Sequence, residues 1–308
     1  MAYYLGIDGG GSKTTCVVGD EVSQLATTTA GPSNITRVGE ARARESLQEA
    51  IRQACTAAGI DPHQVQRASV GIAGAGRAKI ADAVRKIVAD IIPGEIEIVG
   101  DMEIALAAAF GEEPGVMVIA GTGSIAYGRD VQGRTARAGG WGFAISDEGS
   151  AHWIGRTAVS TLLRAIDQED TGAEASSLCR EMKAAWNSHS FDEFLRVANV
   201  DADFPLLFPG ILAAADAGDA LAQRVLGQAG RELAQLAAIV SRRLFAEGGA
   251  NGAIPLAIAG GVFLHSPAVR EVFRDEVHNL DSRHEVNPRV VEPVVGALQM
   301  ARRNQQRG

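Results

Sequence analysis

A glycine-rich turn between two apolar, β-prone segments occurs twice in this chain, near the start of each half. The first copy is Asp8-Gly-Gly-Gly-Ser12 and the second is Gly121-Thr-Gly-Ser124. At an offset of 112 residues, Gly9, Gly11 and Ser12 fall on Gly121, Gly123 and Ser124. Because turn chemistry and element order both repeat, we interpret the two halves as copies of one domain. Two unrelated hairpins are the alternative interpretation.

Such a turn is suited to binding phosphate. A strand that turns on glycines presents several backbone N–H groups to one point, and no Cβ blocks the approach of an anion. Asp8 ends the first strand, where a carboxylate tolerates a phosphate only if a cation lies between them. We therefore expect a Mg²⁺-nucleotide rather than a bare anion. For the first copy taken alone, an ordinary hairpin turn is equally compatible with the residues.

The chain of 308 residues is long enough for two domains with separate cores. The Gly111-Glu-Glu-Pro-Gly115 segment is the best candidate for their junction. We predict a first domain over residues 1–113 and a second over 114–292 that contains a mostly helical region at 172–248. The last helix, within 293–308, could rejoin the first domain.

Hydrophobic periodicity predicts alternating strands and helices in both halves. In the first half, strands are expected around the first turn and at 25–30, 68–73 and 96–99, with helices at 39–58, 79–90 and 102–110. In the second half, strands are expected at 116–120, 125–129, 134–138 and 254–259, with helices at 151–166, 220–246 and after Pro267 and Pro293.

Charge and hydropathy exclude several classes of function. The net charge is −8, and the chain has no basic tract, so we expect no nucleic-acid partner. No apolar run approaches the ~20 residues of a membrane span, and the chain begins in a strand without a leader pattern. Cys16, Cys55 and Cys179 are far apart in sequence. We therefore expect a cytoplasmic protein with reduced cysteines and no membrane association.

Asp101 is the residue that we expect to carry chemistry. It follows a buried strand and precedes a helix N-terminus, where the scaffold fixes a carboxylate and favours its charge. An acceptor hydroxyl needs such a carboxylate to orient it and to take its proton as the bond to phosphorus forms. The alternative is that Asp101 only caps the following helix.

Four further positions have both a binding and a structural interpretation. Asp147 and Glu148 could hold sugar hydroxyls or cap the next helix. Trp141, between glycines, could stack on a sugar or base, or belong to a core. Asn34 could donate from its amide or simply stabilise a turn. A third glycine pair, Gly260-Gly261, ends a strand and could allow close packing against a flat base.

Together these motifs resemble a known superfamily. The turns at Asp8–Ser12 and Gly121–Ser124 and the segment Ala259-Gly-Gly261 are similar to the two phosphate motifs and the adenosine motif of actin, Hsp70 and the sugar kinases. Gly140-Trp-Gly142 with Ser146-Asp-Glu-Gly-Ser-Ala-His-Trp153 resembles the N-acetylglucosamine kinases of the BadF/BadG/BcrA/BcrD ATPase family. The resemblance extends over essentially the whole chain. It implies an α/β fold of two duplicated ribonuclease-H-like (actin-like ATPase) domains with an inter-domain cleft for sugar and ATP.

The resemblance also implies roles for individual residues. Asp101 would contact the sugar and accept the proton of its 6-hydroxyl as the catalytic base, and Asp8 would hold Mg²⁺ through water. The implied sugar-binding positions are Asn34, Asp101, Gly140, Trp141, Gly142 and Asp147. The implied ATP-binding positions are Gly9, Gly10, Gly11, Ser12, Lys13, Gly121, Thr122, Gly123, Gly260 and Gly261. Ser12 stands where many relatives carry Thr, which keeps the hydroxyl.

We therefore expect an ATP-dependent N-acetylglucosamine kinase that uses Mg²⁺ and forms a homodimer through its helical second half. Glucosamine and N-acetylmuramic acid are alternative acceptors, because loop residues read the differences at C2 and C3. An ATPase activator of a 2-hydroxyacyl-CoA dehydratase is an alternative of another class, but it needs an iron–sulfur cluster with thiolate ligands. The three scattered cysteines do not resemble that arrangement. A non-catalytic sugar sensor on the same fold is the remaining alternative.

Overall fold

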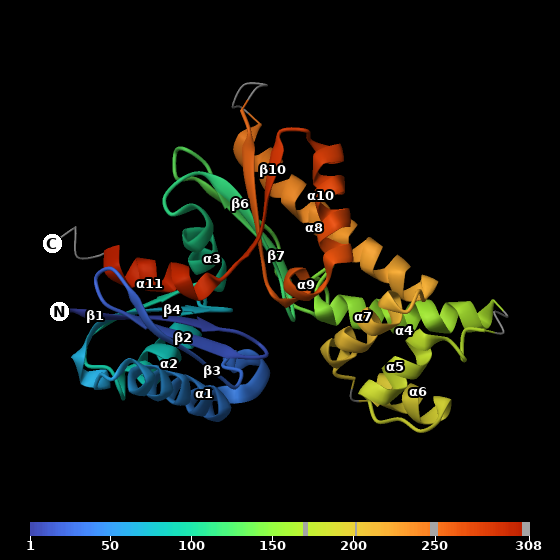
Figure 1. The fold of residues 1–308 in the computed structure, drawn as a ribbon, viewed down its shortest axis with the longest axis horizontal. Coiled ribbons are helices and arrows are strands. Elements are labelled where there is room, and N and C mark those ends of the chain that lie inside the picture. The colour runs from blue at the N-terminus through green and yellow to red at the C-terminus, as the bar shows by residue number, and fades with distance from the viewer. Residues whose placement is uncertain (169–171, 201, 247–251, 304–308) are drawn as a thin grey trace. The chain divides into compact units, whose positions relative to one another are not determined.

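The computed structural model describes residues 1–168, 172–200, 202–246 and 252–303, and its ribbon is drawn in Figure 1. The chain divides into two compact units. Unit 1 comprises Met1–Met117 together with Val291–Gly308, and unit 2 comprises Val118–Val290. The last residues of the expected final segment, 304–308, lie outside the described residues.

Unit 1 contains a five-stranded sheet in the order β3-β2-β1-β4-β5. The strands are β1 (Tyr3–Gly9), β2 (Thr14–Gly19), β3 (Gln24–Ala30), β4 (Val65–Ile72) and β5 (Glu95–Val99). β1, β2 and β3 pair antiparallel, as expected for the strand at 25–30, whereas β1, β4 and β5 run parallel. The carboxyl ends of the three parallel strands therefore meet at one edge of the sheet.

The two faces of this sheet are covered by helices from opposite ends of the sequence. Successive side chains of a strand point to opposite faces. Leu5 and Ile7 accordingly join a core cluster with residues of α1 (Ile35–Ala58) and α2 (Ala78–Ala89). Tyr4 instead packs against Val294 and Leu298 of α11 (Pro293–Arg303), which lies on the strands of unit 1 in Figure 1. The remaining helices of this unit are η1 (Pro62–Gln64) and α3 (Asp101–Phe110).

Helix α1 ends as predicted but begins earlier. Gly59 adopts the left-handed conformation at φ 70° and caps the C-terminus, which confirms the expected stop. The helix starts at Ile35 rather than at residue 39, because the Asn34 side chain caps it there. Gly39, at φ 79°, interrupts the helical geometry close to the predicted start.

The second sheet repeats the strand order of the first. Its order is β10-β9-β6-β7-β8, so that reading from β8 to β10 reproduces the sequence of positions from β3 to β5. The strands are β6 (Gly115–Ala120), β7 (Ser124–Arg129), β8 (Thr135–Gly139), β9 (Ile254–Ala259) and β10 (His284–Val291). The shared topology supports the duplication inferred from the two glycine turns.

Strand β10 is absent from the sequence-based prediction. Its segment contains Pro288, which cannot donate to a ladder and argues against a central strand. β10 lies at the edge of the sheet, where one side of the backbone needs no strand partner. A proline is tolerated at that position for this reason.

The rest of unit 2 is helical. Its helices are α4 (Ala151–Asp167), α5 (Ser177–Ala185), α6 (Phe191–Val200), η2 (Phe204–Leu207), α7 (Phe208–Asp216), α8 (Ala220–Phe245), α9 (Gly261–His265) and α10 (Pro267–Leu280). The long helix expected at 220–246 is confirmed as α8. Asp219 caps it by accepting hydrogen bonds from the N–H groups of Leu221 and Ala222, at 3.0 and 3.2 Å.

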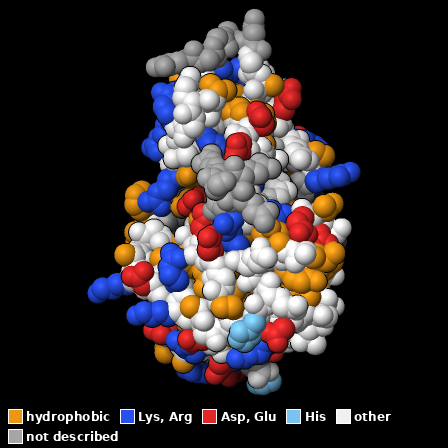
Figure 2. Space-filling view, turned by 90° about the vertical axis from the view of Figure 1, so that its left-hand side faces the viewer, with side chains coloured by type: hydrophobic (Ala, Val, Ile, Leu, Met, Phe, Trp, Pro, Cys, Tyr) orange, Lys and Arg blue, Asp and Glu red, His pale blue; other side chains and the backbone are white. Residues whose placement is uncertain are grey.

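Within the described residues, no single helix is both long and apolar enough to cross a membrane. Phe204–Asp216 and Ala220–Phe245 would meet the criteria of length and composition only as a pair, bent by 117°. Figure 2 shows basic and acidic side chains interspersed over the face that it presents.

Candidate active site

The glycine turn of unit 1 is closed by a hydrogen bond from Gly10 N to Lys13 O, at 2.9 Å. A loop at residues 31–34 packs against this turn. The N–H groups of Ser33 and Asn34 both donate to Gly10 O, each at 3.2 Å. A Cβ on Gly9 would lie 2.7 Å from Ser33 Oγ, so the absence of a side chain at this position permits the contact.

Asn34 has the structural role that its sequence context allowed. Its Oδ1 atom accepts a hydrogen bond from Thr36 N at 3.1 Å and caps α1. The amide nitrogen is therefore the group that could donate to a ligand, as expected for a sugar-binding residue. The backbone of Asn34 is held against the glycine turn, so these two predicted elements of the site lie together.

Asp8 and Asp101 lie at the carboxyl edge of the parallel strands. Asp8 belongs to β1, and Asp101 is the first residue of α3, immediately after β5 and Gly100. The pKa of Asp8 is raised from 3.8 to about 7, mainly by burial and also by the charge of Asp101, while Lys13 acts in the opposite direction. Burial also raises the pKa of Asp101, opposed by a hydrogen bond from Met102 N to its Oδ1 at 3.0 Å.

Asp101 is not the cap of α3. The N-cap is Gly100, whose N–H donates to Glu103 Oε1 at 3.1 Å. Glu103 thus performs the capping role that was the structural alternative for Asp101. Asp101 is instead held by the first turn of the helix, with one oxygen on Met102 N. The role of Asp101 as a general base stays a prediction.

The residues of unit 1 fit a nucleotide-bound divalent cation. Two nearby carboxyl groups whose ionisation is opposed by burial and by mutual repulsion would both be stabilised by such a cation. No group of three or more His, Cys, Asp or Glu side chains is arranged to hold a metal in the described part of the chain. Water and phosphate oxygens would therefore supply the other ligands, which is the usual situation for Mg²⁺.

The glycine turn of unit 2 is bonded to the start of α4. A hydrogen bond from Gly121 N to Gly123 O, at 2.9 Å, closes the turn. The carbonyls of Gly121 and Thr122 accept hydrogen bonds from Ala151 N and His152 N, at 2.9 and 3.4 Å. The first N–H groups of a helix have no acceptor inside the helix, and here carbonyl groups of the turn serve as their acceptors.

The two turns differ in length, which shifts the sequence alignment. The first turn spans Gly10–Lys13 between β1 and β2, whereas the second spans Gly121–Gly123 between β6 and β7. Thr14 begins β2 and Ser124 begins β7. The structural counterpart of Ser124 is therefore Thr14, not Ser12 as the constant offset suggested.

Asp147 joins the second turn to the Trp141 loop. Its Oδ1 atom accepts a hydrogen bond from Gly142 N at 3.3 Å, and a Cβ on Gly123 would lie 2.6 Å from its Oδ2. Burial raises the pKa of Asp147, opposed by the Gly142 hydrogen bond, while the charge of Glu148 raises it. Its φ of 67° is in the left-handed region, which an Asp adopts at a local cost. Asp147 does not cap α4.

The capping role at α4 belongs to Ser150, whose Oγ accepts a hydrogen bond from Trp153 N at 3.2 Å. Asp147 and Ser150 are nevertheless linked, because Ser150 N donates to Asp147 O at 3.1 Å. The carboxylate of Asp147 is thus placed by the backbone of the loop and not by a helix terminus. A buried carboxylate held in this way is suited to accepting hydrogen bonds from hydroxyl groups.

Trp141 is not a core residue, since 66% of it is exposed. The guanidinium carbon of Arg137, on β8, lies 4.1 Å from the centroid of the Trp141 ring and forms a cation–π contact. Gly140 and Gly142, at φ 68° and 107°, allow the chain to turn on either side of the ring. Arg137 is absent from the residues predicted from sequence. Its place as a basic residue on the strand that leads into the Trp141 loop was the one signal for it.

Gly260 and Gly261 connect β9 to α9. Gly260 has φ 98°, and a Cβ there would collide with the carbonyl oxygen of Ala120. The glycine pair therefore lies against the end of β6, directly before the second turn. Two predicted ATP-binding elements of unit 2 are thus brought together.

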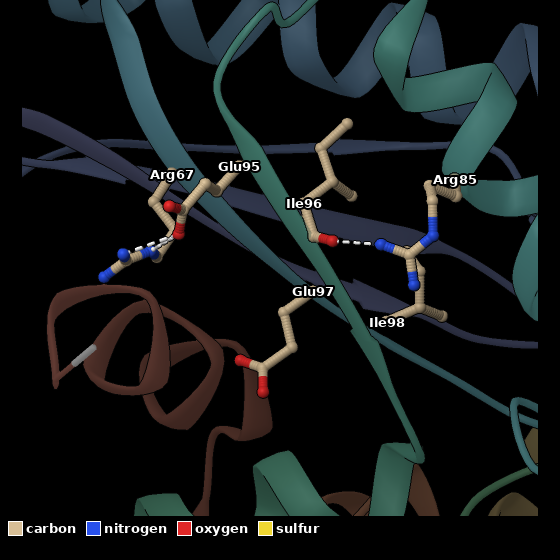
Figure 3. A pocket seen from close by; sticks show the side chains of 6 residues that line it. All are labelled: Arg67, Arg85, Glu95, Ile96, Glu97 and Ile98. Atoms are coloured by element: carbon tan, nitrogen blue, oxygen red, sulfur yellow. Dashed lines mark hydrogen bonds and ion pairs between the residues drawn. The ribbon is translucent and has the colours of Figure 1, made fainter. Parts of the chain in front are cut away.

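A pocket of about 370 Å³ runs along β5, away from the predicted residues (Figure 3). None of the predicted site residues lines it; its lining consists of Arg67, Arg85, Glu95, Ile96, Glu97 and Ile98. Arg67 forms an ion pair with Glu95 at 2.6 Å, and Arg85 donates to the carbonyl of Ile96. Both arginines of this pocket therefore interact with residues of the edge strand β5.

Comparisons with known proteins agree with the fold and the motifs. Residues 5–301 match the model of the BadF/BadG/BcrA/BcrD ATPase family. An N-acetylmuramic acid/N-acetylglucosamine kinase from Clostridium acetobutylicum is 33% identical over 89% of this chain and 90% of that protein. An N-acetyl-D-glucosamine kinase from Dictyostelium discoideum is 27% identical, with 97% of both chains covered.

Among solved structures, the provisionally assigned N-acetylglucosamine kinase of Chromobacterium violaceum superposes with a TM-score of 0.77. It is 24% identical, and the match covers 98% of this chain and 99% of that one. This similarity and the repeated strand order confirm the α/β fold with two duplicated actin-like ATPase domains. The cleft expected between the two domains stays a prediction.

Proposed function

The chain belongs to the BadF/BadG/BcrA/BcrD ATPase family, and from that premise we propose that it is an ATP-dependent amino-sugar kinase. In the proposed reaction, the 6-hydroxyl oxygen of N-acetylglucosamine attacks the γ-phosphorus of ATP. The bond between that phosphorus and the β,γ-bridging oxygen breaks, which gives the 6-phosphate, ADP and one proton. Asp101 takes that proton as the new O–P bond forms.

The position of Asp101 is the observation that carries this proposal. Its carboxyl is fixed at the start of α3 by Met102 N, and burial raises its pKa toward the range in which a carboxylate accepts protons effectively. It interacts electrostatically with Asp8, which precedes the glycine turn. A base beside a phosphate-binding turn is what phosphoryl transfer to a hydroxyl requires.

The glycine turns would hold the phosphates of ATP. Backbone N–H groups of Gly9–Lys13 and of Gly121–Gly123 are the proposed donors, and Lys13 adds a positive charge near Asp8. Gly260 and Gly261 would contact the adenosine. Asp8 would hold Mg²⁺ through water, and the bound cation supplies charge neutralisation on the phosphate oxygens.

The sugar would be held by the loops of Asn34 and Trp141. The Asn34 amide nitrogen and the Asp147 carboxylate are suited to sugar hydroxyls and to the acetamido group. The exposed Trp141 ring could stack on the C–H face of the sugar, while Arg137 supports it. Gly140 and Gly142 keep this loop clear of Cβ atoms.

N-acetylmuramic acid is the second candidate acceptor. The relative from Clostridium acetobutylicum, 33% identical to this chain, is named for both N-acetylmuramic acid and N-acetylglucosamine. These sugars differ at C3 and share the 6-hydroxyl, so the proposed role of Asp101 is the same for both. A cytoplasmic location and a homodimer remain predictions, and light scattering of the purified protein would measure the second.

The test is a coupled ADP-release assay with Mg-ATP and a panel of acceptors: N-acetylglucosamine, N-acetylmuramic acid, glucosamine, N-acetylmannosamine and glucose. We expect release that depends on N-acetylglucosamine. Release with glucosamine alone would contradict the proposed acceptor while keeping the kinase class. Release that is independent of every sugar would contradict the kinase proposal and favour an ATPase.

A further inference from the structure

In both units, the strand that follows the glycine turn begins with a residue whose buried hydroxyl donates a hydrogen bond to a neighbouring loop. Thr14 is 0% exposed, and its Oγ1 donates to Gly31 O at 2.7 Å. Ser124 is 4% exposed, and its Oγ donates to Glu148 O at the same distance of 2.7 Å. The two hydroxyls thus have equivalent places in the duplicated topology, and each bonds to a loop carbonyl. The Thr14 hydroxyl has a second partner in its loop, Ser33 Oγ at 2.7 Å.

Each of these two hydrogen-bonded loops contains a residue that is proposed to contact the sugar. In unit 1, the loop ends at Asn34, whose N–H donates to Gly10 O of the turn at 3.2 Å. In unit 2, the loop contains Asp147, whose Oδ2 lies 2.6 Å from the Cβ position of Gly123. Each loop is therefore both hydrogen-bonded to and packed against its turn. A displacement of either loop must alter the backbone that would face the phosphates.

We propose that Thr14 and Ser124 are positioning residues that couple sugar binding to nucleotide binding within each unit. This inference rests on the proposed function of the turns and loops. Both hydroxyls bond to loop residues that are not assigned to a ligand contact through those atoms, so their removal leaves the groups assigned to the ligands in place. Coupling of this kind is reciprocal: a bound sugar strengthens nucleotide binding by the factor with which nucleotide strengthens sugar binding.

The test is calorimetric titration of N-acetylglucosamine into the full chain, with and without saturating Mg²⁺ and a non-hydrolysable ATP analogue. For the unaltered chain, we expect the nucleotide analogue to raise sugar affinity by a factor of about 5–150. Ser124→Ala and Thr14→Val should each lower this factor at least ~threefold, while affinity for sugar alone changes by less than about threefold. Ser124→Thr and Thr14→Ser keep the hydroxyl and should restore the factor.

Two control variants match these substitutions. Thr15→Val makes the same change one residue along β2, where the side chain faces the other side of the sheet. Ser146→Ala removes a hydroxyl that bonds to Glu148 Oε2 at 3.1 Å, inside the loop and not to the turn. Both controls should keep the factor of the unaltered chain.

An unchanged factor in Ser124→Ala and Thr14→Val would overturn the inference, as would an equal loss in the controls or a factor near one in the unaltered chain. Because the two hydroxyls lie in different units, a variant that does not fold leaves the other as the test. Failure of the unaltered chain to bind any sugar would instead contradict the proposed function itself, so the two failures are distinguishable.

Discussion

Arg137 pairs with Trp141, the ring on which the sugar would stack in the proposed function. The guanidinium carbon lies 4.1 Å from the ring centroid, and the ring itself is largely exposed. A cation–π contact at such a site contributes about 0.5–1 kcal/mol. Its main effect here would be to hold the ring in one orientation before the sugar arrives, so that less ordering is required on binding.

We expect Arg137→Leu to raise the KM for the sugar about two- to fivefold, in keeping with that energy, and to leave the KM for ATP nearly unchanged. Steady-state kinetics with each substrate varied in turn would measure both values. Arg156→Leu, which changes an exposed arginine on α4, is the control and should alter neither KM. An unchanged sugar KM in Arg137→Leu would show that the stacked arginine does not support binding.

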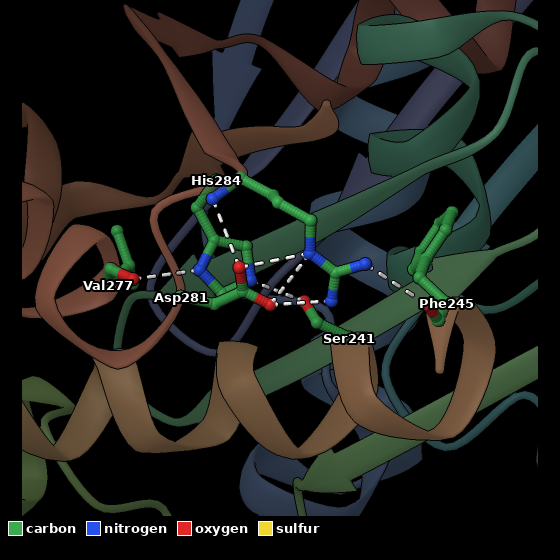
Figure 4. Close-up of polar contacts among 6 residues, drawn as sticks. Ser241, Phe245, Val277, Asp281 and His284 are labelled. Carbon is green, nitrogen blue, oxygen red and sulfur yellow. Dashed lines mark hydrogen bonds and ion pairs between the residues drawn. The ribbon is translucent and has the colours of Figure 1, made fainter. Parts of the chain in front are cut away.

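Asp281 is a charged residue that we expect to stabilise the fold. Arg283 Nη2 donates to its Oδ2 at 2.7 Å and Arg283 Nε donates to its Oδ1 at 3.0 Å (Figure 4). These bonds lower the pKa of Asp281 from 3.8 to about 2. A carboxyl whose pKa is lower in the folded state stabilises the fold above its unfolded pKa, and this contribution is lost as the pH falls toward 2.

Asp281→Asn should therefore lower the free energy of unfolding at pH 7 by about 1–2 kcal/mol. The difference from the unaltered chain should be constant from pH 7 to 5 and should shrink below about pH 4. Thermal unfolding at several pH values measures this trend. Asp275→Asn, in an exposed pair 3.5 Å from Arg274, should change the stability little at any pH. A difference that grows on acidification would contradict the assignment.

At the scale of elements, the two glycines of the second turn differ in the space around their Cβ positions. Gly121 has no neighbour within 4 Å of its Cβ position, whereas the Cβ position of Gly123 lies 2.6 Å from Asp147 Oδ2. A Cβ at residue 121 therefore has open space around it, and in the proposed function a side chain there would obstruct a phosphate. A side chain at residue 123 would displace a residue assigned to the sugar.

We predict opposite effects for substitutions at these two glycines. Gly121→Val should keep the melting temperature and weaken binding of Mg-ATP more than binding of N-acetylglucosamine. Gly123→Ala should weaken sugar binding more, because Asp147 must move. Calorimetry with each ligand alone, together with thermal unfolding, gives the comparison. Equal losses of both ligands in both variants would mean that the turn has only a structural role.

Local signals predicted most elements of this chain and failed where the decisive partner was remote. Gly59 ended α1 as expected, since a left-handed C-cap is a property of the local backbone. β10 was missed because Pro288 is acceptable only at a sheet edge, and edge position depends on the whole sheet. The strand-to-helix position of Asp101 was likewise readable from local residues.

The finer relations of the site were not readable from sequence. Ser124 bonds to Glu148 O, 24 positions along the chain, and Thr14 reaches Gly31 O, 17 positions away. The equivalence of these two hydroxyls was hidden because the turns differ in length. The contact between Arg137 and Trp141 was not predicted, because it depends on the turn that the chain makes at Gly139 and Gly140 between them.

At the scale of the whole molecule, the chain is a duplicated fold whose last helix returns to its first unit. Both sheets have the same strand order, and α11 packs Leu298 against Tyr4 and Val17 of the first strands. Because of the duplication, each unit has its own glycine turn and a loop that is hydrogen-bonded to the strand after that turn. In unit 1, Asp101 follows strand β5 and interacts electrostatically with Asp8, whereas the carboxylate packed against the turn of unit 2 is Asp147, which comes from a loop. We therefore assign different parts of the proposed reaction to the two copies.

The most direct test of this assignment is to identify the product made from Mg-ATP and N-acetylglucosamine. ³¹P and ¹³C NMR of the reaction mixture would show which oxygen carries the phosphate, for the unaltered chain and for Asp101→Asn. We predict N-acetylglucosamine 6-phosphate, formed about 10²–10⁴-fold more slowly by Asp101→Asn, which should still fold and bind ATP. A phosphate on another oxygen, or equal rates for the two proteins, would contradict the account.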